Sequence, residues 1–320
     1  MGNGFNECMQ KYAFGGGTFR LGSTVCLEML IAATLLVSPA LVVPPARLVV
    51  VGPGSREVQL LVSKLAAAAG HGVSLVARDA DIRPFNTLMY GEQQPEVENA
   101  PRYATQNTQI GMALGSAEGL VLCLAGSPVP PSTSGFATML PYASRLKRVV
   151  LLSAIGGSIG NTGGLGEGDA IKRCEEEIFE LAAGAGVEVS TARVGVLKGG
   201  AAAGENEAGF GLNRVAYYAS LTSGGYPTPA SQTAAKYDKE TLGVAVLKGG
   251  AIPARSVVVR AQTRTSAAPC ADEVSRINAA CALLALLRRE GPPLEVSLSS
   301  AEGATPPSDA EWDALLATVA

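Results

Sequence analysis

The chain has 320 residues, a formal net charge of −3 and a charged fraction of only 17%. This length can bury the core of one large α/β domain, and the lack of a basic surplus excludes a typical nucleic-acid-binding protein. One histidine, His71, and six scattered cysteines without a C-x-x-C pair leave almost no ligands for a metal ion, so we expect no metal site.

The first 46 residues form an N-terminal extension. A glycine-rich stretch is followed by an almost uninterrupted apolar run that begins at Val25 and ends at Val43. Three interpretations remain open: a membrane span, which needs about 20 apolar residues and is here interrupted by Pro39; a targeting peptide; or a helix docked on protein. We favour a membrane-associated or docking helix over a targeting segment.

A βαβ unit follows the extension, in residues 47–79. A β-branched run leads into the glycine turn Gly52-Pro53-Gly54, then apolar residues recur at helical spacing until Gly70, and a second β-branched run follows. In such units the helix N-terminus offers free N–H groups to a pyrophosphate. The fingerprint is imperfect, because Glu57 fills the third glycine slot of G-x-G-x-x-G, so a unit that binds no nucleotide remains an alternative.

Strands and helices continue to alternate, which predicts a parallel sheet covered on both faces. We expect a Rossmann-type doubly wound domain over residues 47–289, with about six or seven strands and a small substrate-side lobe. The expected strands span residues 102–108, 119–126, 149–153, 187–192 and 256–261, and the expected helices 110–114, 136–146, 170–183, 213–221, 242–247 and 272–289.

The last segment, residues 290–320, is interpreted as a flexible tail with a terminal helix. Residues 290–308 are rich in proline, serine and glycine, and an amphipathic helix over 311–319 carries the only tryptophan, Trp312. A terminal aromatic helix of this kind docks on its own domain or on a partner.

Several motifs, taken in order, resemble those of atypical short-chain dehydrogenases/reductases, the group with NmrA-like and plastid NAD(P)-binding Rossmann-fold proteins. The resemblance covers roughly residues 47–260, and the run Thr191–Leu197 is its most specific part. The matching stretches are Leu75-Val76-Ala77-Arg78-Asp79, Ala117-Glu118-Gly119-Leu120-Val121, Val149 to Ser153, Lys172-Arg173-Cys174-Glu175-Glu176, Thr191-Ala192-Arg193-Val194-Gly195-Val196-Leu197, and Asp238 before the expected helix 242–247.

The resemblance implies a dinucleotide site at the carboxyl ends of the first strands. An arginine at the end of the second strand suits the 2′-phosphate of NADP, whereas a carboxylate there selects NAD. Because Arg78 precedes Asp79 and Arg56 lies in the glycine turn, NADP(H) is favoured over NAD(H); an ordinary surface ion pair is the alternative for Arg78. The implied cofactor-binding residues are Gly52, Gly54, Ser55, Arg56, Arg78, Asp79 and, near the adenine-linked ribose, Gly126.

The catalytic machinery implied by the resemblance is incomplete. Ser153 and Lys172 correspond to the family's serine and lysine, but Gly168 stands four residues before the lysine, where the proton-donating tyrosine belongs. Tyr217, Tyr218 and Tyr226 occur later, where we expect them to pack. The run Glu175–Glu177 is expected on a solvated helix face, and His71 in a solvent-facing turn.

Two functions follow from these patterns. The first is an NAD(P)-binding accessory or assembly subunit of an organellar membrane complex, photosynthetic or respiratory, that contacts its partners through the Val25-to-Val43 run and the C-terminal tail. A plastid location on the stromal side is favoured over a mitochondrial or cytoplasmic one. The alternative is an active NADP-dependent oxidoreductase or isomerase on a small organic substrate.

Overall fold

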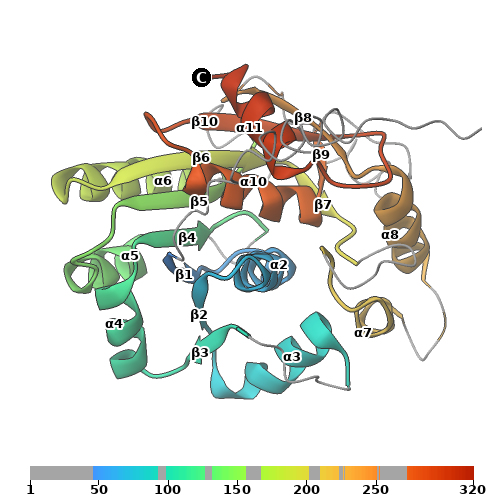
Figure 1. Cartoon of the computed structure of the whole chain (residues 1–320), viewed down its shortest axis with the longest axis horizontal. Coiled ribbons are helices and arrows are strands. Elements are labelled where there is room, and N and C mark those ends of the chain that lie inside the picture. The colour runs from blue at the N-terminus through green and yellow to red at the C-terminus, as the bar shows by residue number, and fades with distance from the viewer. Residues whose placement is uncertain are drawn as a thin grey trace, which may run out of the picture. The chain divides into compact units, whose positions relative to one another are not determined.

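A computed structural model describes residues 46–92, 99–126, 132–155, 167–201, 210–222, 226, 228–250, 252 and 272–320. They form a Rossmann-type α/β fold, in which an eight-stranded sheet carries helices on both faces (Figure 1). The predicted fold class is therefore confirmed. The apolar run from Val25 to Val43, residues 156–166 and the expected strand 256–261 lie outside the described residues.

The main sheet has the strand order β3-β2-β1-β4-β5-β6-β10-β8. Its strands are parallel, except that β8 pairs antiparallel with β10. The chain starts in the middle, at β1, builds outward to β3, and then returns to the other side of β1 with β4. The strands are β1 (Arg47–Val51), β2 (Gly72–Val76), β3 (Arg102–Ala104), β4 (Gly119–Cys123), β5 (Arg148–Ala154), β6 (Glu188–Val194), β8 (Gly243–Lys248) and β10 (Glu295–Ala301).

Helices cover both faces of the sheet because its central strands are apolar on both sides. In β1, Val50 packs into one core with α2 and α10, while Val49 packs into the other with α4, α5 and α6. The helices are α2 (Arg56–Ala68), α3 (Ile82–Tyr90), α4 (Asn107–Ser116), α5 (Ser134–Met139), α6 (Glu167–Gly184), α7 (Arg214–Ser220), α8 (Pro229–Glu240), α10 (Arg276–Arg288) and α11 (Asp309–Ala317), with single 3-10 turns at η1 (Asp79–Asp81) and η2 (Leu140–Tyr142).

Local sequence explains both ends of α2, the helix that faces the glycine turn. Ser55 is its N-cap, and the side-chain oxygen accepts a hydrogen bond from the N–H of Val58 at 3.4 Å. At the other end Gly70 takes a φ of 86°, the left-handed conformation that glycine adopts without a steric penalty. The predicted start and end of this helix are confirmed.

The C-terminal region differs most from the expectation. Residues 243–248 form the strand β8 where a helix was expected, because the run Gly-Val-Ala-Val-Leu-Lys pairs with β10 over its whole length. The expected flexible tail contains β10 itself, which lies inside the sheet between β6 and β8. In α11, Trp312 is 1% exposed and packs into the same core as α2 and α10, so the C-terminal segment is part of the domain.

Two other expected helices are shorter than predicted. The expected helix 136–146 ends as α5 and the turn η2 by Tyr142. The expected helix 272–289 begins with a short strand, β9 (Glu273–Ser275), which pairs in parallel with β7 (Val196–Lys198) in a separate two-stranded sheet. The helix α10 then starts at Arg276. This arrangement brings Arg276 next to Gly199, the residue just after β7.

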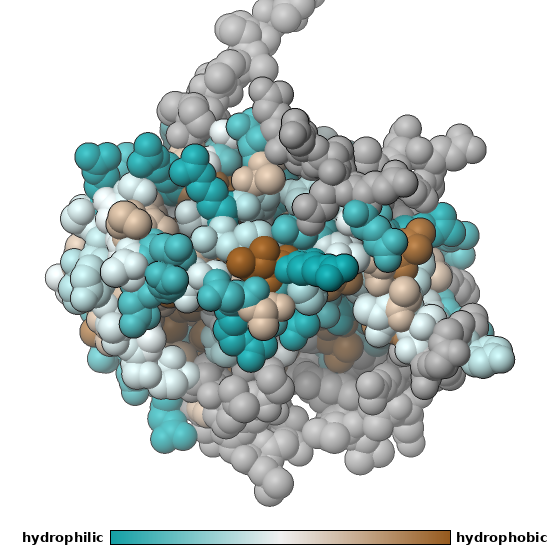
Figure 2. All heavy atoms as spheres, turned by 90° about the horizontal axis from the view of Figure 1, so that it is seen from below, coloured by the Kyte–Doolittle hydropathy of each residue, from teal (hydrophilic) through white to brown (hydrophobic). Residues whose placement is uncertain are grey.

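Among the described residues, no helix has both the length and the apolar character that a membrane crossing requires. The face in Figure 2 is mostly hydrophilic or neutral where residues are described, with small, separate hydrophobic spots. Single exposed apolar side chains of this kind are normal on a folded domain.

Candidate functional site

The glycine turn after β1 packs directly against the end of β4. The N–H of Gly54 donates to the carbonyl oxygen of Cys123 at 2.9 Å, and the N–H of Ser55 donates to that of Ala125 at 2.8 Å. A Cβ atom on Gly52 would lie 2.2 Å from the Cys123 oxygen, and one on Gly54 would lie 2.5 Å from the Ala125 oxygen. Both glycines are therefore required by backbone packing, whether or not a ligand binds.

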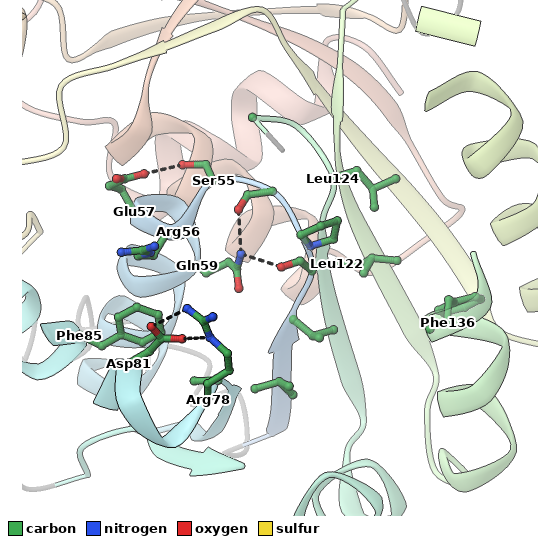
Figure 3. A pocket seen from close by; sticks show the side chains of 18 of the residues that line it. Ser55, Arg56, Glu57, Gln59, Arg78, Asp81, Phe85, Leu122, Leu124 and Phe136 are labelled. Atoms are coloured by element: carbon green, nitrogen blue, oxygen red, sulfur yellow. Dashed lines mark hydrogen bonds and ion pairs between the residues drawn. The ribbon is translucent and has the colours of Figure 1, made fainter. Parts of the chain in front are cut away.

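A residue that the sequence analysis missed fixes the shape of this turn. Gln59 is 8% exposed and lies in the second turn of α2. Its amide Nε2 donates to the carbonyl oxygens of Gly52 and Gly54, each at 3.1 Å (Figure 3). The only sequence signal was a polar residue between the apolar positions Val58 and Leu60.

An open cleft of about 1240 Å³ adjoins the turn. It lies beyond the carboxyl ends of β1 and β4, the point where the strand order reverses and where open α/β sheets bind ligands. Figure 3 shows the polar side chains of the glycine turn, α2 and the end of β2 on one side and the apolar Leu122, Leu124 and Phe136 on the other.

One end of the cleft carries two arginines. Arg78, just after β2, forms a bidentate pair with Asp81, with N···O distances of 2.7 and 3.0 Å. The hydrogen bonds from Arg78 hold the pKa of the Asp81 carboxyl below its usual range, and Arg56 adds to this effect. The guanidinium of Arg56 lies 5.6 Å from the centre of the Phe85 ring, a cation–π contact. No carboxylate within salt-bridge distance of Arg56 is found among the described residues.

The carboxylate at this end is thus Asp81, not the predicted Asp79. Asp79 is exposed and is not among the described residues that line the cleft. The difference arises because η1 turns the chain after Arg78, so that the residue three positions later faces the arginine. The ion pair that was the alternative interpretation for Arg78 is present, and both of its residues line the cleft. A contact of Arg78 with a 2′-phosphate remains a prediction.

The other end of the cleft is formed by residues 195–197, Gly126 and Arg276. Arg276 donates through Nη1 to the carbonyl oxygen of Gly199 at 2.8 Å, and its Nε lies 3.7 Å from the Oε2 atom of Glu57. Glu57 also accepts a hydrogen bond from the Ser55 hydroxyl at 3.0 Å. Arg276 was missed because no local pattern indicates that the start of its helix lies beside the glycine turn.

The predicted cofactor-binding residues are therefore largely brought together. Those that line the cleft are Gly52, Gly54, Ser55, Arg56, Arg78 and Gly126. The N–H groups of Gly54 and Ser55 already donate to Cys123 of β4 and to Ala125 just after it, however, and so are not free for a phosphate. Gly126 lies against Ser55 and Leu197, at the end of the cleft away from β2; its contact with the ribose remains a prediction.

Ser153 and Lys172 do not form a catalytic pair in this structure. Ser153 is fully buried, and its hydroxyl donates to the carboxylate of Glu175. The side chain of Lys172 is 47% exposed and lies 3.8 Å from Glu176 on the same helix. Neither residue is among the described residues that line the cleft.

The prediction of a solvated face for residues 175–177 is wrong for Glu175. Its side chain is 3% exposed and forms a bidentate pair with Arg193 of β6, with both N···O distances at 2.7 Å. Arg193 also donates through Nε to Glu295 of β10 at 2.7 Å. A buried carboxylate needs such partners, because leaving it unpaired would be very costly.

Among the remaining candidates, Tyr226 is 78% exposed, so the expectation that it packs is wrong, whereas the others have structural roles. His71 lies at the opposite edge of the sheet, where Nδ1 accepts a hydrogen bond from the N–H of Ala46 at 3.2 Å. Tyr217 is 2% exposed and donates to Gly199, and burial raises its pKa to about 12, so it is a poor proton donor at neutral pH. Tyr218 donates to Asp238 at 3.1 Å. No cluster of side chains that could hold a metal ion occurs in the described part of the chain.

Comparisons with known proteins find similarity in structure alone. No protein-family model and no curated protein matches the sequence. A Bacillus halodurans protein provisionally described as an NAD-dependent epimerase/dehydratase is 14% identical, with a TM-score of 0.48, and the match covers 85% of this chain and 99% of that one. UDP-N-acetylglucosamine 4-epimerase from Bacillus cereus is 12% identical, with a TM-score of 0.41, covering 81% and 80%. At these values the comparisons identify no substrate or cofactor for this chain.

Proposed function

We propose that this protein binds a nicotinamide dinucleotide in the cleft, and that it prefers NADP(H) to NAD(H). The observation that carries the proposal is the pair of arginines at the β2 end, Arg56 and Arg78, with Asp81 as the only carboxylate paired there among the described residues. Two guanidinium groups at one end of the cleft suit the 2′-phosphate of NADP. Phe85 offers an apolar surface beside these cations.

The test uses NADPH and NADH binding to variants of the full chain. We expect Arg56→Gln and Arg78→Gln each to weaken NADPH binding by roughly 10- to 100-fold, because each variant loses one charge-assisted hydrogen bond to the phosphate. NADH binding should remain nearly unchanged, because NADH carries no 2′-phosphate. Arg145→Gln is the matched control, because Arg145 is exposed and does not line the cleft. Equal effects on both dinucleotides would contradict the preference.

We further propose that the protein acts without the serine–tyrosine–lysine proton relay, as an accessory or assembly subunit. The support is the burial of Ser153 against Glu175, the exposure of Lys172 and the glycine four residues before that lysine. A cleft that keeps its cofactor residues and lacks the relay fits a protein that uses the dinucleotide for structure or sensing.

The competing proposal is an active NADP-dependent oxidoreductase or isomerase with a different acid. Lys172→Ala tests the form of this proposal in which Lys172 takes part in catalysis. We expect the variant to bind NADPH like the wild type and to consume it at the same rate. A loss of turnover with unchanged NADPH affinity and unchanged thermal stability would favour the enzyme.

The site of action is proposed to be an organellar membrane, with a plastid favoured, and the contact to be the run from Val25 to Val43. The support is its composition: roughly ten apolar side chains, each contributing about 1.5–3 kcal/mol when fully buried, could hold the domain on lipid or on a partner subunit. We expect a chain lacking residues 1–43 to leave the membrane fraction. Continued sedimentation of the truncated chain, or full solubility of the complete one, would contradict the anchor.

A further inference from the structure

Arg276 occupies an unusual position in the cleft. It is the first residue of α10, and its side chain is 22% exposed. One nitrogen, Nη1, is anchored on the carbonyl oxygen of Gly199 at 2.8 Å and lies 3.4 Å from the hydroxyl of Tyr217. The Nε atom is buried and makes no hydrogen bond within the described part of the chain; its ion-pair partner, Oε2 of Glu57, lies 3.7 Å away, beyond hydrogen-bond distance. A buried N–H without an acceptor is costly unless a ligand supplies one.

The N-terminus of α2 has few free donors for a phosphate group. A dinucleotide placed in this cleft would bring its pyrophosphate to the N-terminus of α2. There the N–H groups of Gly54 and Ser55 already donate to the end of β4 and to Ala125 just after it, and the Glu57 carboxylate in the first helical turn would repel the phosphates. Arg276 lies beside this carboxylate, at 3.7 Å, and comes from a segment more than 200 residues away in sequence.

We propose that Arg276 binds the pyrophosphate of the dinucleotide, in place of the missing glycine-loop N–H groups, and that Asp238 is the residue that positions it. This proposal rests on the proposed function of the cleft. It assigns separate tasks to the two ends: Arg56 and Arg78 recognise the 2′-phosphate, whereas Arg276 recognises the part common to NADP and NAD.

The positioning role of Asp238 follows from its contacts. Its side chain comes from α8, is 0% exposed, and accepts hydrogen bonds from the N–H groups of Gly200 at 2.7 Å and Ala201 at 3.2 Å. It thereby clamps the turn after β7, in which Gly199 takes a φ of 61°. A Cβ atom on Gly199 would lie 2.0 Å from the Asp238 oxygen, so only glycine fits there. The same turn presents the Gly199 carbonyl oxygen to both Arg276 and Tyr217.

The test is the affinity of the full chain for NADP⁺ and NAD⁺, measured by calorimetry. We expect Arg276→Gln to weaken both dinucleotides by the same factor, roughly 10- to 100-fold, because both carry the pyrophosphate. By contrast, Arg56→Gln and Arg78→Gln should change the ratio of the affinities for NADP⁺ and NAD⁺. Arg145→Gln again serves as the control. If Arg276→Gln binds both like Arg145→Gln, while the wild type binds, this inference is wrong and the proposed function stands.

Glu57 separates direct binding from charge compensation. Glu57→Gln should tighten both dinucleotides, because it removes a repelling charge. If Arg276 contacts the phosphates, the double variant Glu57→Gln/Arg276→Gln should bind more weakly than Glu57→Gln alone. Equal affinity of these two variants would mean that Arg276 only neutralises Glu57.

The positioning role needs its own readout. We expect Asp238→Asn to weaken NADP⁺ and NAD⁺ equally, and to add little to the loss when it is combined with Arg276→Gln. Circular dichroism and thermal unfolding confirm that each variant remains folded, and Asp238→Glu provides a second variant if the asparagine form does not fold. The proposed coupling between Asp238 and Arg276 would be wrong if the losses of affinity from the two substitutions added up in the double variant. It would also be wrong if Asp238→Asn changed the ratio of the affinities for NADP⁺ and NAD⁺. If the wild type binds neither dinucleotide, both this inference and the proposed function fail.

Discussion

Glu175 shows how strongly a single residue can depend on distant partners. Three consecutive glutamates predict a solvated helix face, yet the first is buried with Arg193 from β6, which in turn reaches Glu295 of β10. We expect Glu175→Gln to lower the free energy of unfolding by about 3–5 kcal/mol, because the buried Arg193 loses its main counter-charge. Glu176→Gln is the matched control, since that side chain is 59% exposed. Urea denaturation measures the free energy of unfolding of both variants. Equal and small losses of stability would contradict a stabilising role for the buried Glu175–Arg193 pair.

A second residue-scale prediction concerns pH. Burial raises the pKa of Asp238 to about 6, from an ordinary value of 3.8. The folded chain therefore holds the proton more tightly than the unfolded chain between about pH 4 and pH 6. The stability of the wild type relative to Asp238→Asn should fall as the pH rises through this window, by on the order of 3 kcal/mol, and then level off. Urea denaturation at several pH values tests this, and parallel stability curves would refute it.

At the scale of elements, the glycine turn is set by backbone contact with β4. We expect Gly54→Ala to destabilise the fold by about 1–3 kcal/mol, because the new methyl group would press on the carbonyl oxygens of Cys123, the last residue of β4, and of Ala125. Gly184→Ala in α6 is the control: no atom lies within 4 Å of its added Cβ, and alanine favours the helix by about 0.5–1 kcal/mol. If Gly54→Ala and Gly184→Ala both unfolded at the wild-type melting temperature, the close backbone contact would not require glycine at position 54.

The elements that sequence predicts well are those with a strong local signal. The βαβ unit combines a β-branched run, close-packed glycines and a capped helix, and its boundaries agree with β1, α2 and β2. By contrast, β10 contains three serines and was expected to be loop. Two of these buried hydroxyls have partners from other segments: Ser297 accepts from the N–H of Gly250 at 3.1 Å, and Ser300 accepts from that of Ser275 at 2.8 Å. No local pattern reveals such partners.

In the candidate site, too, the residues that belong to one local unit could be predicted from the sequence, and those that depend on distant segments could not. Gly52, Gly54, Arg56 and Arg78 were predicted because they belong to one local unit. Asp81 was missed because a 3-10 turn decides which acidic residue meets Arg78. Arg276 was missed because only the pairing of β7 with β9 brings its helix to the cleft.

At the scale of the whole molecule, the C-terminal segment completes the domain. Trp312 of α11 is buried in the core shared with α2 and α10. We expect Trp312→Ala to lower the free energy of unfolding by about 3–5 kcal/mol, the usual cost of removing a large buried aromatic side chain, with Trp312→Phe losing less. Thermal unfolding measures this. If Trp312→Ala were as stable as the wild type, α11 would not be packed on the domain and the C-terminal segment would be a free tail.

The central claim about the whole molecule is that the cleft binds a dinucleotide and prefers the one with a 2′-phosphate. Calorimetric titration of the wild-type full-length chain with NADP⁺ and with NAD⁺ tests it most directly. The account predicts that both bind at one site and that NADP⁺ binds tighter by on the order of tenfold, about 1.4 kcal/mol. No heat with either dinucleotide at millimolar concentration, or tighter binding of NAD⁺, would contradict it.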